Sequence, residues 1–361
     1  METPESCPLC GCMTSSVFCL CKDHMVSGQL FHVKQCSDCA LFYTGPRPNK
    51  LKISDYYKSD AYISHVEEGN SLFEKLYRLV RNTMLKQKLR LLRAYLQTGG
   101  YAEVNSTAER KGVTEPAGHR PDHASGVTEP AGHRPDHGSG QPEPGRQSPG
   151  PAESIPETFG KAALLDIGCG TGAFIQAARR QGYSVKGYEP QERARLAAIS
   201  KGLDVTGEEE GLDQMPGSSF QTITMWHVLE HIHDLKPMLD QIDRLLAPGG
   251  TLFVAVPVRN AFDAVFYGEY WAAWDVPRHL YHFDRKTIRM VFEPKGFTCL
   301  GRRGLPFDSF YVSLLSEKYR NTLPAGFRHI RAMLIGMASN ILGITGLKPW
   351  SSEVYIFRKQ G

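Results

Sequence analysis

The sequence predicts an α/β fold built on a mostly parallel sheet, preceded by a small cysteine-rich region and a helical connector. From residue 161 onward, short apolar runs alternate with helical patterns, which is typical of βαβ units whose sheet is covered on both faces. Seven of the nine cysteines lie within the first 39 residues. We therefore expect four parts, at residues 1–48, 49–100, 101–160 and 161–361.

The first part carries two C-x2-C pairs, CPLC and CSDC, separated by 25 residues. Two such knuckles supply four thiolates for tetrahedral zinc, and four protein ligands leave no open position for a substrate. The ligands expected for this structural zinc ribbon are Cys7, Cys10, Cys36 and Cys39. Cys12, Cys19 and Cys21 remain, either as a substitute ligand or as free thiols. A ribbon that binds nucleic acid is the alternative, but a net charge of +4 without a dense basic patch argues against it.

Residues 49–100 contain a basic amphipathic pattern, in which leucines recur at helical spacing within SLFEKLYRLVRNTMLKQKLRLLRAYL. We interpret it as a docking helix with a solvated, charged outer face. After it, GVTEPAGHRPDH occurs at 112–123 and again at 126–137. This third part has almost no large apolar residues, so burial cannot offset its ordering entropy and we expect a disordered insertion. Loose metal binding by its four histidines is the alternative.

The fourth part alternates apolar runs with helical patterns. The expected strands read AALLDIG, SVKGYEP, QTITMWHV, GTLFVAVP, FTCLGRRG and SEVYIFRK. The expected helices between them read GAFIQAARRQG, QERARLAAISKG and LKPMLDQIDRLLAPGG. Near the C-terminus, AMLIGMASNILGITGL predicts a packed helix, with a membrane-surface helix as the alternative. No apolar run reaches the ~18 residues of a spanning helix, and the first residues lack the features of a secretory signal, so we expect a cytoplasmic protein.

The stretch LLDIGCGTGAF, residues 164–174, places a glycine-rich turn between the first of these strands and a helix. Such a turn lets the backbone approach a ligand at a helix N-terminus. GCGTGA also satisfies the dinucleotide pattern, so a dinucleotide and S-adenosylmethionine both fit. Asp166 favours the second, because its carboxylate would repel a pyrophosphate but suits an ammonium and a sulfonium. Glu189, 23 residues later, can accept both ribose hydroxyls of either cofactor.

Four stretches, LLDIGCGTGAF, VKGYEP, ITMWHVLEHIHD and LLAPGGTLFVAVP, together resemble the successive motifs of class I S-adenosylmethionine-dependent methyltransferases over about residues 161–300. The resemblance implies a Rossmann-like sheet with an antiparallel last strand. It also implies that Asp166 and the glycines line the methionine end of the cofactor, that Glu189 binds the ribose, and that residues 212–213 border the adenine. The cofactor-binding residues expected on this basis are Asp166, Gly168, Cys169, Gly170, Gly172, Glu189, Leu212, Asp213 and Trp226. Gln221 stands where many relatives have a structural Asp, and we expect little functional change from it.

The motif WHVLEHIHD follows the strand whose end faces the transferring methyl in this family. On a short helix, His227 and His231 would share a face at i, i+4. A related group of O-methyltransferases carries Glu in place of His227 and uses this corner for a divalent ion. We favour the interpretation that Glu230 and His231 form structural hydrogen bonds over the interpretation that they bind a metal.

The aromatic stretch YGEYWAAWDVPRHLYHF, residues 267–283, is similar to one found in methyltransferases with an N-terminal zinc ribbon. A structural interpretation pairs Arg278 with Asp275 and buries the aromatic rings. A functional interpretation makes His279 or His282 the general base that removes a proton from an alcohol acceptor, with His227 as a third catalytic candidate.

The sequence thus predicts an S-adenosylmethionine-dependent methyltransferase with a structural zinc. The expected acceptor is a small molecule, a sugar or a lipid-linked group, methylated on oxygen, with neither nucleic acid nor stable membrane insertion involved. Two alternatives are an NAD-dependent dehydrogenase and a zinc-ribbon adaptor with an inactive core.

Overall fold

A computed structural model describes residues 1–57, 72–96, 162–207 and 209–361. The chain divides into two units, residues 1–103 with 161–361 and residues 104–160, and all described residues belong to the first. The predicted disordered insertion at 101–160 lies outside the described residues. The predicted division into domains stays a prediction.

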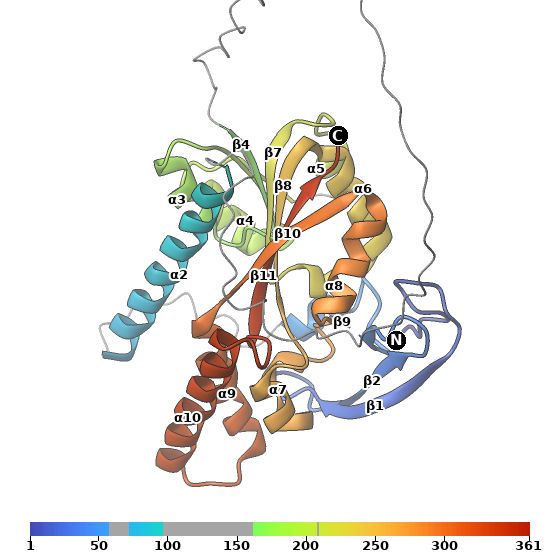
Figure 1. Ribbon diagram of the computed structural model, residues 1–361, viewed down its shortest axis with the longest axis vertical. Helices are drawn as coiled ribbons and strands as arrows, with labels where there is room; N and C mark the ends of the chain where they lie inside the picture. Colours follow the sequence, from blue (N-terminus) through green and yellow to red (C-terminus); the bar gives the residue numbers. More distant parts are fainter. Residues whose placement is uncertain (58–71, 97–161, 208) are drawn as a thin grey trace, which may run out of the picture. The chain divides into compact units, whose positions relative to one another are not determined.

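The main sheet has seven strands in the order β10-β11-β8-β7-β4-β5-β6 (Figure 1). Its strands are β4 (Ala163–Ile167), β5 (Ser184–Tyr188), β6 (Val205–Thr206), β7 (Phe220–Trp226), β8 (Leu246–Pro257), β10 (Phe297–Gly304) and β11 (Ser352–Lys359). β4 to β8 run parallel, and β11 is antiparallel to both β8 and β10. The predicted mostly parallel sheet with an antiparallel last strand is confirmed. The chain runs outward from β4 to β6 and returns to β7 beside β4, so the strand order reverses between β4 and β7, where α/β sheets bind ligands.

Helices cover both faces of this sheet. They include α2 (Leu72–Leu96), α3 (Ala173–Arg180), α4 (Glu192–Ile199), α5 (Glu209–Asp213), α6 (Leu235–Leu245) and α8 (Arg285–Phe292). Alternate strand residues point to opposite faces, so Leu164 packs in one apolar cluster with Leu92 of α2, while Leu165 packs in another with Ile242 of α6. The expected docking of the basic helix is therefore confirmed for its described side chains.

The third predicted helix ends earlier than expected. It was expected to reach Gly250, but α6 stops at Leu245 and Leu246 already pairs with Phe220 as the first residue of β8. Pro248 lacks a backbone donor and Gly249 has a φ of 70°, so neither residue suits a continuing helix.

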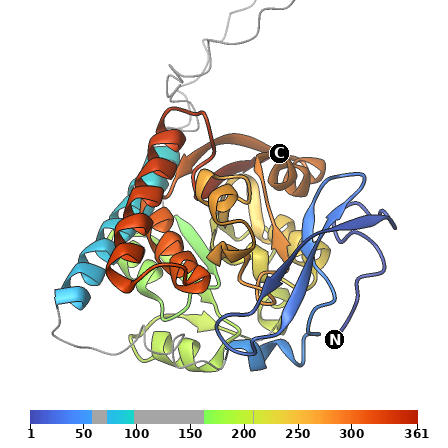
Figure 2. The ribbon, with the colours of Figure 1, turned by 90° about the horizontal axis from the view of Figure 1, so that it is seen from below.

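A second, four-stranded sheet has the order β1-β2-β3-β9. Its strands are β1 (Ser15–Lys22), β2 (Leu30–Cys36), β3 (Phe42–Thr44) and β9 (Tyr281–His282). β9 comes from the aromatic stretch, about 240 residues further along the chain, and pairs Phe42 with His282. We call β1–β3 with their loops, residues 1–48, the ribbon. In Figures 1 and 2 the ribbon lies to one side of the main sheet and the C-terminal helices to the other.

The C-terminal helices α9 (Pro306–Arg320) and α10 (Ala325–Ile344) pack against each other and against α7 (Phe262–Tyr267). They precede β11, and the backbone N–H of Leu305 donates to the carbonyl of Ser352. Because β11 is antiparallel to β8, Ser352 pairs with Pro257 at the carboxyl end of the parallel strands. α9 therefore begins at this end of the sheet, at the foot of Figure 1. Within the described part of the chain, every helix is too short or too polar to cross a bilayer.

Candidate active site

The glycine turn between β4 and α3 admits only glycine at key positions. Gly168, Gly170 and Gly172 have φ values of 73°, 54° and 77°, a region that other residues rarely adopt. A Cβ on Gly168 would lie 2.3 Å from Cγ2 of Val228, and one on Gly172 would lie 2.3 Å from Cδ1 of Leu203. The turn is therefore fixed both by its backbone conformation and by its neighbours.

Glu189, just after β5, reaches back to this turn. The backbone N–H of Gly170 donates to its Oε2 at 2.8 Å, and that of Gln191 donates to its Oε1 at 2.9 Å. Burial raises the pKa of Glu189, although these two N–H groups oppose the rise. A carboxylate oxygen can accept more than one hydrogen bond, so both oxygens keep capacity for the two hydroxyls of a ribose.

Asp166, in β4, is buried beside the turn. The hydroxyl of Thr224 donates to its Oδ1 at 2.5 Å. Burial raises the pKa of Asp166 to about 7, against the opposing effects of Thr224 and the Lys88 ammonium. The carboxylate is thus costly to ionise until a cation reaches it.

Lys88 of α2 was not predicted as a site residue. Its Nζ lies 4.5 Å from the centre of the Trp226 ring, at the end of β7, and burial lowers its pKa. Its spacing could have indicated this buried position. Lys88 stands three residues after Leu85 and four before Leu92, on the buried face of the helix.

The remaining expected cofactor residues are spread around the turn. Leu212, in α5, is buried, whereas Asp213 is exposed and accepts a hydrogen bond from Nε2 of Gln241 on α6. Cys169 is buried, and a Cβ on Gly187 would lie 2.6 Å from its Sγ. Cys169 thus packs against β5, and Asp213 is already engaged with α6.

His227 follows β7 and does not share a helical face with His231. Its φ is 59°, and the only helical residues of the motif are the 3-10 turn Leu229–His231. Nε2 of His227 lies 3.0 Å from Oδ2 of Asp308 on α9, and its Nδ1 lies 3.4 Å from Oε1 of Glu230. Although burial opposes the charge, the two carboxylates raise the pKa of His227 to about 10. An imidazole that stays protonated at neutral pH is unsuited to the role of general base.

Glu230, His231 and His279 form the second cluster of the site. One potential ligand atom from each lies within 4.8 Å of the other two. Glu230 is fully buried, and within the described residues neither of its carboxylate oxygens accepts a hydrogen bond. Its charge is balanced by the imidazole of His227, whose Nδ1 lies 3.4 Å from Oε1. Although burial opposes the ionised form, this imidazole lowers the pKa of Glu230.

The two imidazoles of this cluster are oriented by backbone carbonyls. Nδ1 of His279 lies 2.8 Å from the carbonyl oxygen of Ala273, and Nδ1 of His231 lies 3.1 Å from that of Arg278. With a proton on each Nδ1, both Nε2 atoms carry a lone pair, which is how metal-binding histidines are commonly held. Nδ1 of His231 also lies 3.0 Å from the hydroxyl of Tyr57, and Nε2 of His279 lies 3.8 Å from Oδ2 of Asp275. Burial lowers the pKa of His231 to about 4, so this ring is neutral at pH 7.

His282 lies apart from this cluster, in β9. Its Nε2 is 3.1 Å from the hydroxyl of Thr44 in the ribbon, and its ring meets that of Trp274 edge to face at 4.8 Å. Burial lowers its pKa well below the usual value. Of the two histidines predicted as bases, His279 is therefore the one placed beside Glu230.

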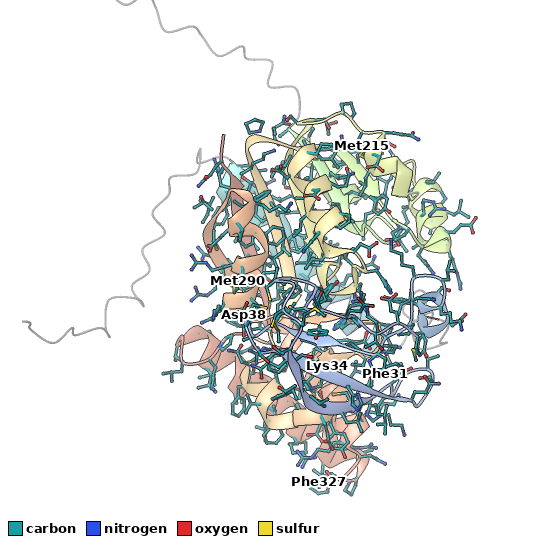
Figure 3. The ribbon with its side chains drawn as sticks, turned by 90° about the vertical axis from the view of Figure 1, so that its right-hand side faces the viewer. Phe31, Lys34, Asp38, Met215, Met290 and Phe327 are labelled. Atoms are coloured by element: carbon teal, nitrogen blue, oxygen red, sulfur yellow. The ribbon has the colours of Figure 1, made fainter. Side chains whose placement is uncertain are left out.

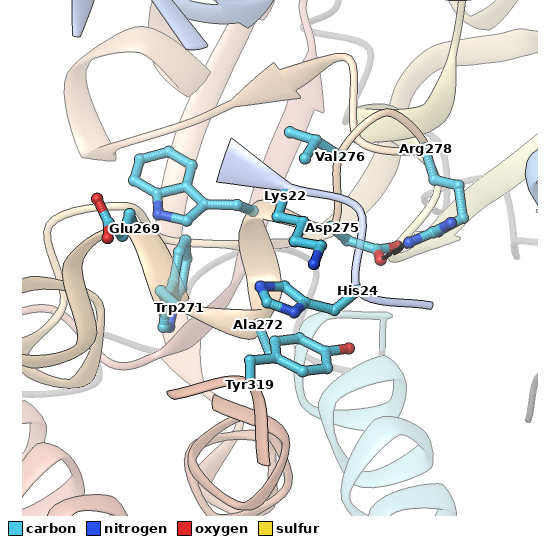
Figure 4. A pocket seen from close by; sticks show the side chains of 10 residues that line it. Lys22, His24, Glu269, Trp271, Ala272, Asp275, Val276, Arg278 and Tyr319 are labelled. Carbon is cyan, nitrogen blue, oxygen red and sulfur yellow. Dashed lines mark hydrogen bonds and ion pairs between the residues drawn. The ribbon is translucent and has the colours of Figure 1, made fainter. Parts of the chain in front are cut away.

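An ion-pair network joins the aromatic stretch to the ribbon. The guanidinium of Arg278 donates to Asp275 at 2.6 Å and to Asp23 of the ribbon at 3.1 Å. The predicted pairing of Arg278 with Asp275 is confirmed. A small pocket borders this network, and the imidazole of His24 stacks on the ring of Tyr319 within it at 4.3 Å (Figure 4). Its lining comes from the ribbon, the aromatic stretch and α9 rather than from the glycine turn.

The four predicted zinc ligands lie together in the ribbon. Sγ of Cys7 is 3.5 Å from that of Cys39, and Sγ of Cys10 is 3.6 Å from that of Cys36. All four sulfurs lie within 4.8 Å of one another. The surplus cysteines lie elsewhere: the thiol of Cys12 contacts Thr14, and Cys19 and Cys21 contact each other on β1 at 3.4 Å. The four-thiolate set needs no substitute from them.

Comparison with known proteins assigns the family. Residues 146–301 match a family described as "Methyltransferase domain". A ubiquinone biosynthesis O-methyltransferase of Idiomarina loihiensis is 30% identical over 176 residues, which are 44% of this chain and 71% of that protein. The chain belongs to the family of S-adenosylmethionine-dependent methyltransferases.

Other matches of this methyltransferase are shorter. A ubiquinone biosynthesis O-methyltransferase of Pseudomonas aeruginosa is 33% identical over 136 residues, which are 35% of this chain and 58% of that protein. The chain thus spans only about half of several of its curated relatives. Among solved structures, a SAM-dependent methyltransferase from Archaeoglobus fulgidus has 16% identity and a TM-score of 0.38, over 55% of this chain and 87% of that one.

The raised pKa of Asp166 predicts how cofactor binding by this methyltransferase depends on pH. Without cofactor, the carboxyl is protonated below about pH 7, whereas the ammonium of S-adenosylmethionine favours the ionised form. The affinity should therefore fall as the pH drops from 7.5 to 5.5, by up to about tenfold per pH unit. Calorimetric titration across this range measures the slope. Asp166→Asn should flatten the profile, and an unchanged slope in that variant would assign the effect to another group.

Proposed function

We propose that this methyltransferase transfers the methyl group of S-adenosylmethionine to a hydroxyl oxygen of a small acceptor, such as a phenol, a sugar or a lipid-linked group. The observation that carries the proposal is the cluster of Glu230, His231 and His279 beside the carboxyl end of β7. β7 pairs directly with β4, which carries Asp166. The cluster therefore offers groups that bind and deprotonate a hydroxyl close to the cofactor's methionine end. The printed names of the relatives, O-methyltransferases, support transfer to oxygen.

The reaction is a direct displacement. The acceptor oxygen attacks the methyl carbon, the carbon–sulfur bond breaks, and its electron pair stays on sulfur to give S-adenosylhomocysteine. The acceptor loses its proton to a base, for which we propose Nε2 of His279, because Nδ1 of this ring is held by the carbonyl of Ala273. Holding oxygen, methyl and sulfur in line supplies much of the remaining rate enhancement.

On the cofactor side, we propose that Glu189 accepts hydrogen bonds from the ribose hydroxyls and that Asp166 faces the ammonium of the methionine moiety. Lys88 supplies the charge that suits the carboxylate of the same moiety. The glycine turn brings backbone close to the ligand. Trp226 and residues 212–213 remain proposed cofactor contacts, and Asp213 would first have to release Gln241.

The donor set of Glu230, His231 and His279 fits a divalent transition-metal ion. Two imidazoles and one carboxylate leave coordination positions open, and an ion bound there would share the carboxylate of Glu230 with His227. A bound ion would lower the pKa of the acceptor hydroxyl. In its absence, His279 is the group that takes the proton.

His279→Gln tests the catalytic proposal. With tritiated S-adenosylmethionine and a panel of phenolic, sugar and polyprenyl-phenol acceptors, we expect the substitution to lower kcat at least about a hundredfold and to leave cofactor affinity within about twofold. His32→Gln, at an exposed position on β2, is the matched control and should leave both unchanged. Full turnover in His279→Gln, with wild-type turnover established, would refute the role of His279. Calorimetric titration with Mn²⁺ or Co²⁺ then tests the cluster directly, since Glu230→Gln should abolish a one-site isotherm.

We further propose that the four clustered cysteines hold one structural zinc and that the chain belongs to the zinc-ribbon subfamily. Reduced thiolates suit a cytoplasmic location, which stays a prediction. Elemental analysis of protein purified without chelator should find one zinc per chain. Cys7→Ser should reduce this content and Cys12→Ser should preserve it. Zinc-free wild-type protein with an intact fold would contradict the assignment.

A further inference from the structure

The exposed face of α10 is apolar along its whole length. We call the six residues that form it the outer stripe, and they are Phe327, Ile330, Leu334, Met337, Ile341 and Ile344. Their side chains are between 48% and 69% exposed. At about 100° per residue they occupy an arc of about 100° on the helix, which is the pattern expected of a buried face. Monomeric proteins in water seldom expose a contiguous stripe of this size without a partner.

The opposite face of α10 is fixed by its packing. Ala332, Gly336, Ser339 and Gly343 are buried there, and a Cβ on Gly336 would lie 2.7 Å from the ring of Phe310 on α9. The hydroxyl of Ser339 donates to buried Asp263 at 2.6 Å. Small residues and a buried polar contact therefore set the rotation of the helix, so the outer stripe cannot turn inward without breaking them.

The charged residues of the segment that contains α10 are all of one sign. Residues 318–352 contain no Asp or Glu. The basic residues of this segment are Lys318, Arg320, Arg328, His329, Arg331 and Lys348. Arg331 pairs with Glu317, whereas Lys318 and Lys348 are exposed. An apolar stripe bordered by cations matches the surface of a bilayer that contains anionic lipids.

We propose that α10 binds the surface of an anionic lipid bilayer through the outer stripe, with the apolar side chains among the acyl chains and the flanking cations at the headgroups. A second copy of the chain fits this face less well, because isologous pairing would bring two sets of cations together. Phe327 lies at the outer end of the helical pair, away from the main sheet (Figure 3).

The position of the helix relates this surface to the site. α9, against which α10 packs, carries Asp308 to within 3.0 Å of His227. Bilayer binding through α10 would therefore hold the carboxyl end of the parallel strands near the lipid. An acceptor whose apolar tail remains in the bilayer is the substrate class that such an arrangement serves.

Vesicle sedimentation tests the proposal without any methyl acceptor, so its outcome is independent of the proposed reaction. The full-length protein is mixed with vesicles of phosphatidylcholine alone or with 30% phosphatidylglycerol (w/w). We expect binding to the anionic vesicles that weakens as salt is raised, and weaker binding to the neutral ones. The double variant Leu334→Glu with Ile341→Glu should lower the affinity for anionic vesicles at least about tenfold.

Leu51→Glu is the matched control, because Leu51 is 87% exposed but lies in the turn that follows the ribbon, outside α10. It should bind anionic vesicles like the wild type. Absence of wild-type binding to anionic vesicles would overturn the proposal, as would binding by the double variant equal to that of the wild type. Sedimentation equilibrium without lipid supplies the other decisive outcome: a wild-type dimer that the double variant dissociates would assign the outer stripe to a second copy.

Discussion

Glu189→Ala should raise the Kd for S-adenosylmethionine at least about a hundredfold. The two carboxylate oxygens offer charge-assisted hydrogen bonds to the ribose hydroxyls, each contributing roughly 1.5–3 kcal/mol. The substitution also leaves the backbone N–H groups of Gly170 and Gln191 without their present acceptor.

Calorimetric titration with S-adenosylmethionine, S-adenosylhomocysteine and NAD measures this effect. Glu192→Ala is the matched control, because Glu192 is an exposed carboxylate three residues away at the start of α4. It should bind both sulfur ligands with unchanged affinity. Binding of NAD alone would revive the dehydrogenase alternative, and wild-type affinity in Glu189→Ala would place the ribose elsewhere.

Arg278→Met should lower the free energy of unfolding by about 3–5 kcal/mol. The guanidinium is 1% exposed and compensates two carboxylates, those of Asp23 and Asp275. Methionine replaces most of the side-chain volume but leaves both carboxylates buried without their cation. The loss should be felt by the ribbon and by the aromatic stretch together, because the ion pairs connect the two.

Urea unfolding, followed by far-ultraviolet circular dichroism, checks this prediction. Arg289→Met is the control, since Arg289 forms an exposed pair with Glu293 that should contribute less than about 1 kcal/mol. Adding Asp23→Asn to Arg278→Met should recover part of the loss by removing one uncompensated charge. A midpoint for Arg278→Met equal to that of the wild type would show that water reaches the carboxylates.

Local patterns predicted the main sheet because its strands carry their own signals. A short, mostly apolar run that ends at a glycine, as in β4, can be recognised as a strand without knowledge of any partner. β9 carries no such signal: Tyr281 and His282 form a strand only because β3 of the ribbon lies beside them. Pairing between residues about 240 positions apart is decided by tertiary packing, which one sequence does not display.

Some parts of the candidate site could be predicted from local sequence patterns, and others could not. The spacing of the cysteine pairs and the position of Asp166 relative to the glycines sufficed to place these groups together. The association of Glu230 and His231 with His279 depends on the packing of the aromatic stretch against the 3-10 turn after β7, where the N–H of Leu280 donates to the carbonyl of Glu230. Helical spacing misplaced His227, because a positive φ at that residue ended the expected periodicity.

The strand that completes the ribbon's sheet has a consequence for protein engineering. β9 begins two residues after His279, and the strand with which it pairs, β3, belongs to the first 48 residues. A chimaera that exchanged the ribbon for that of a relative would therefore change the pairing of β3 with β9, next to His279. A fragment that began at residue 161 would lack β3 altogether. The ribbon and residues 161–361 should therefore be exchanged together in engineered proteins, and we expect them to evolve together.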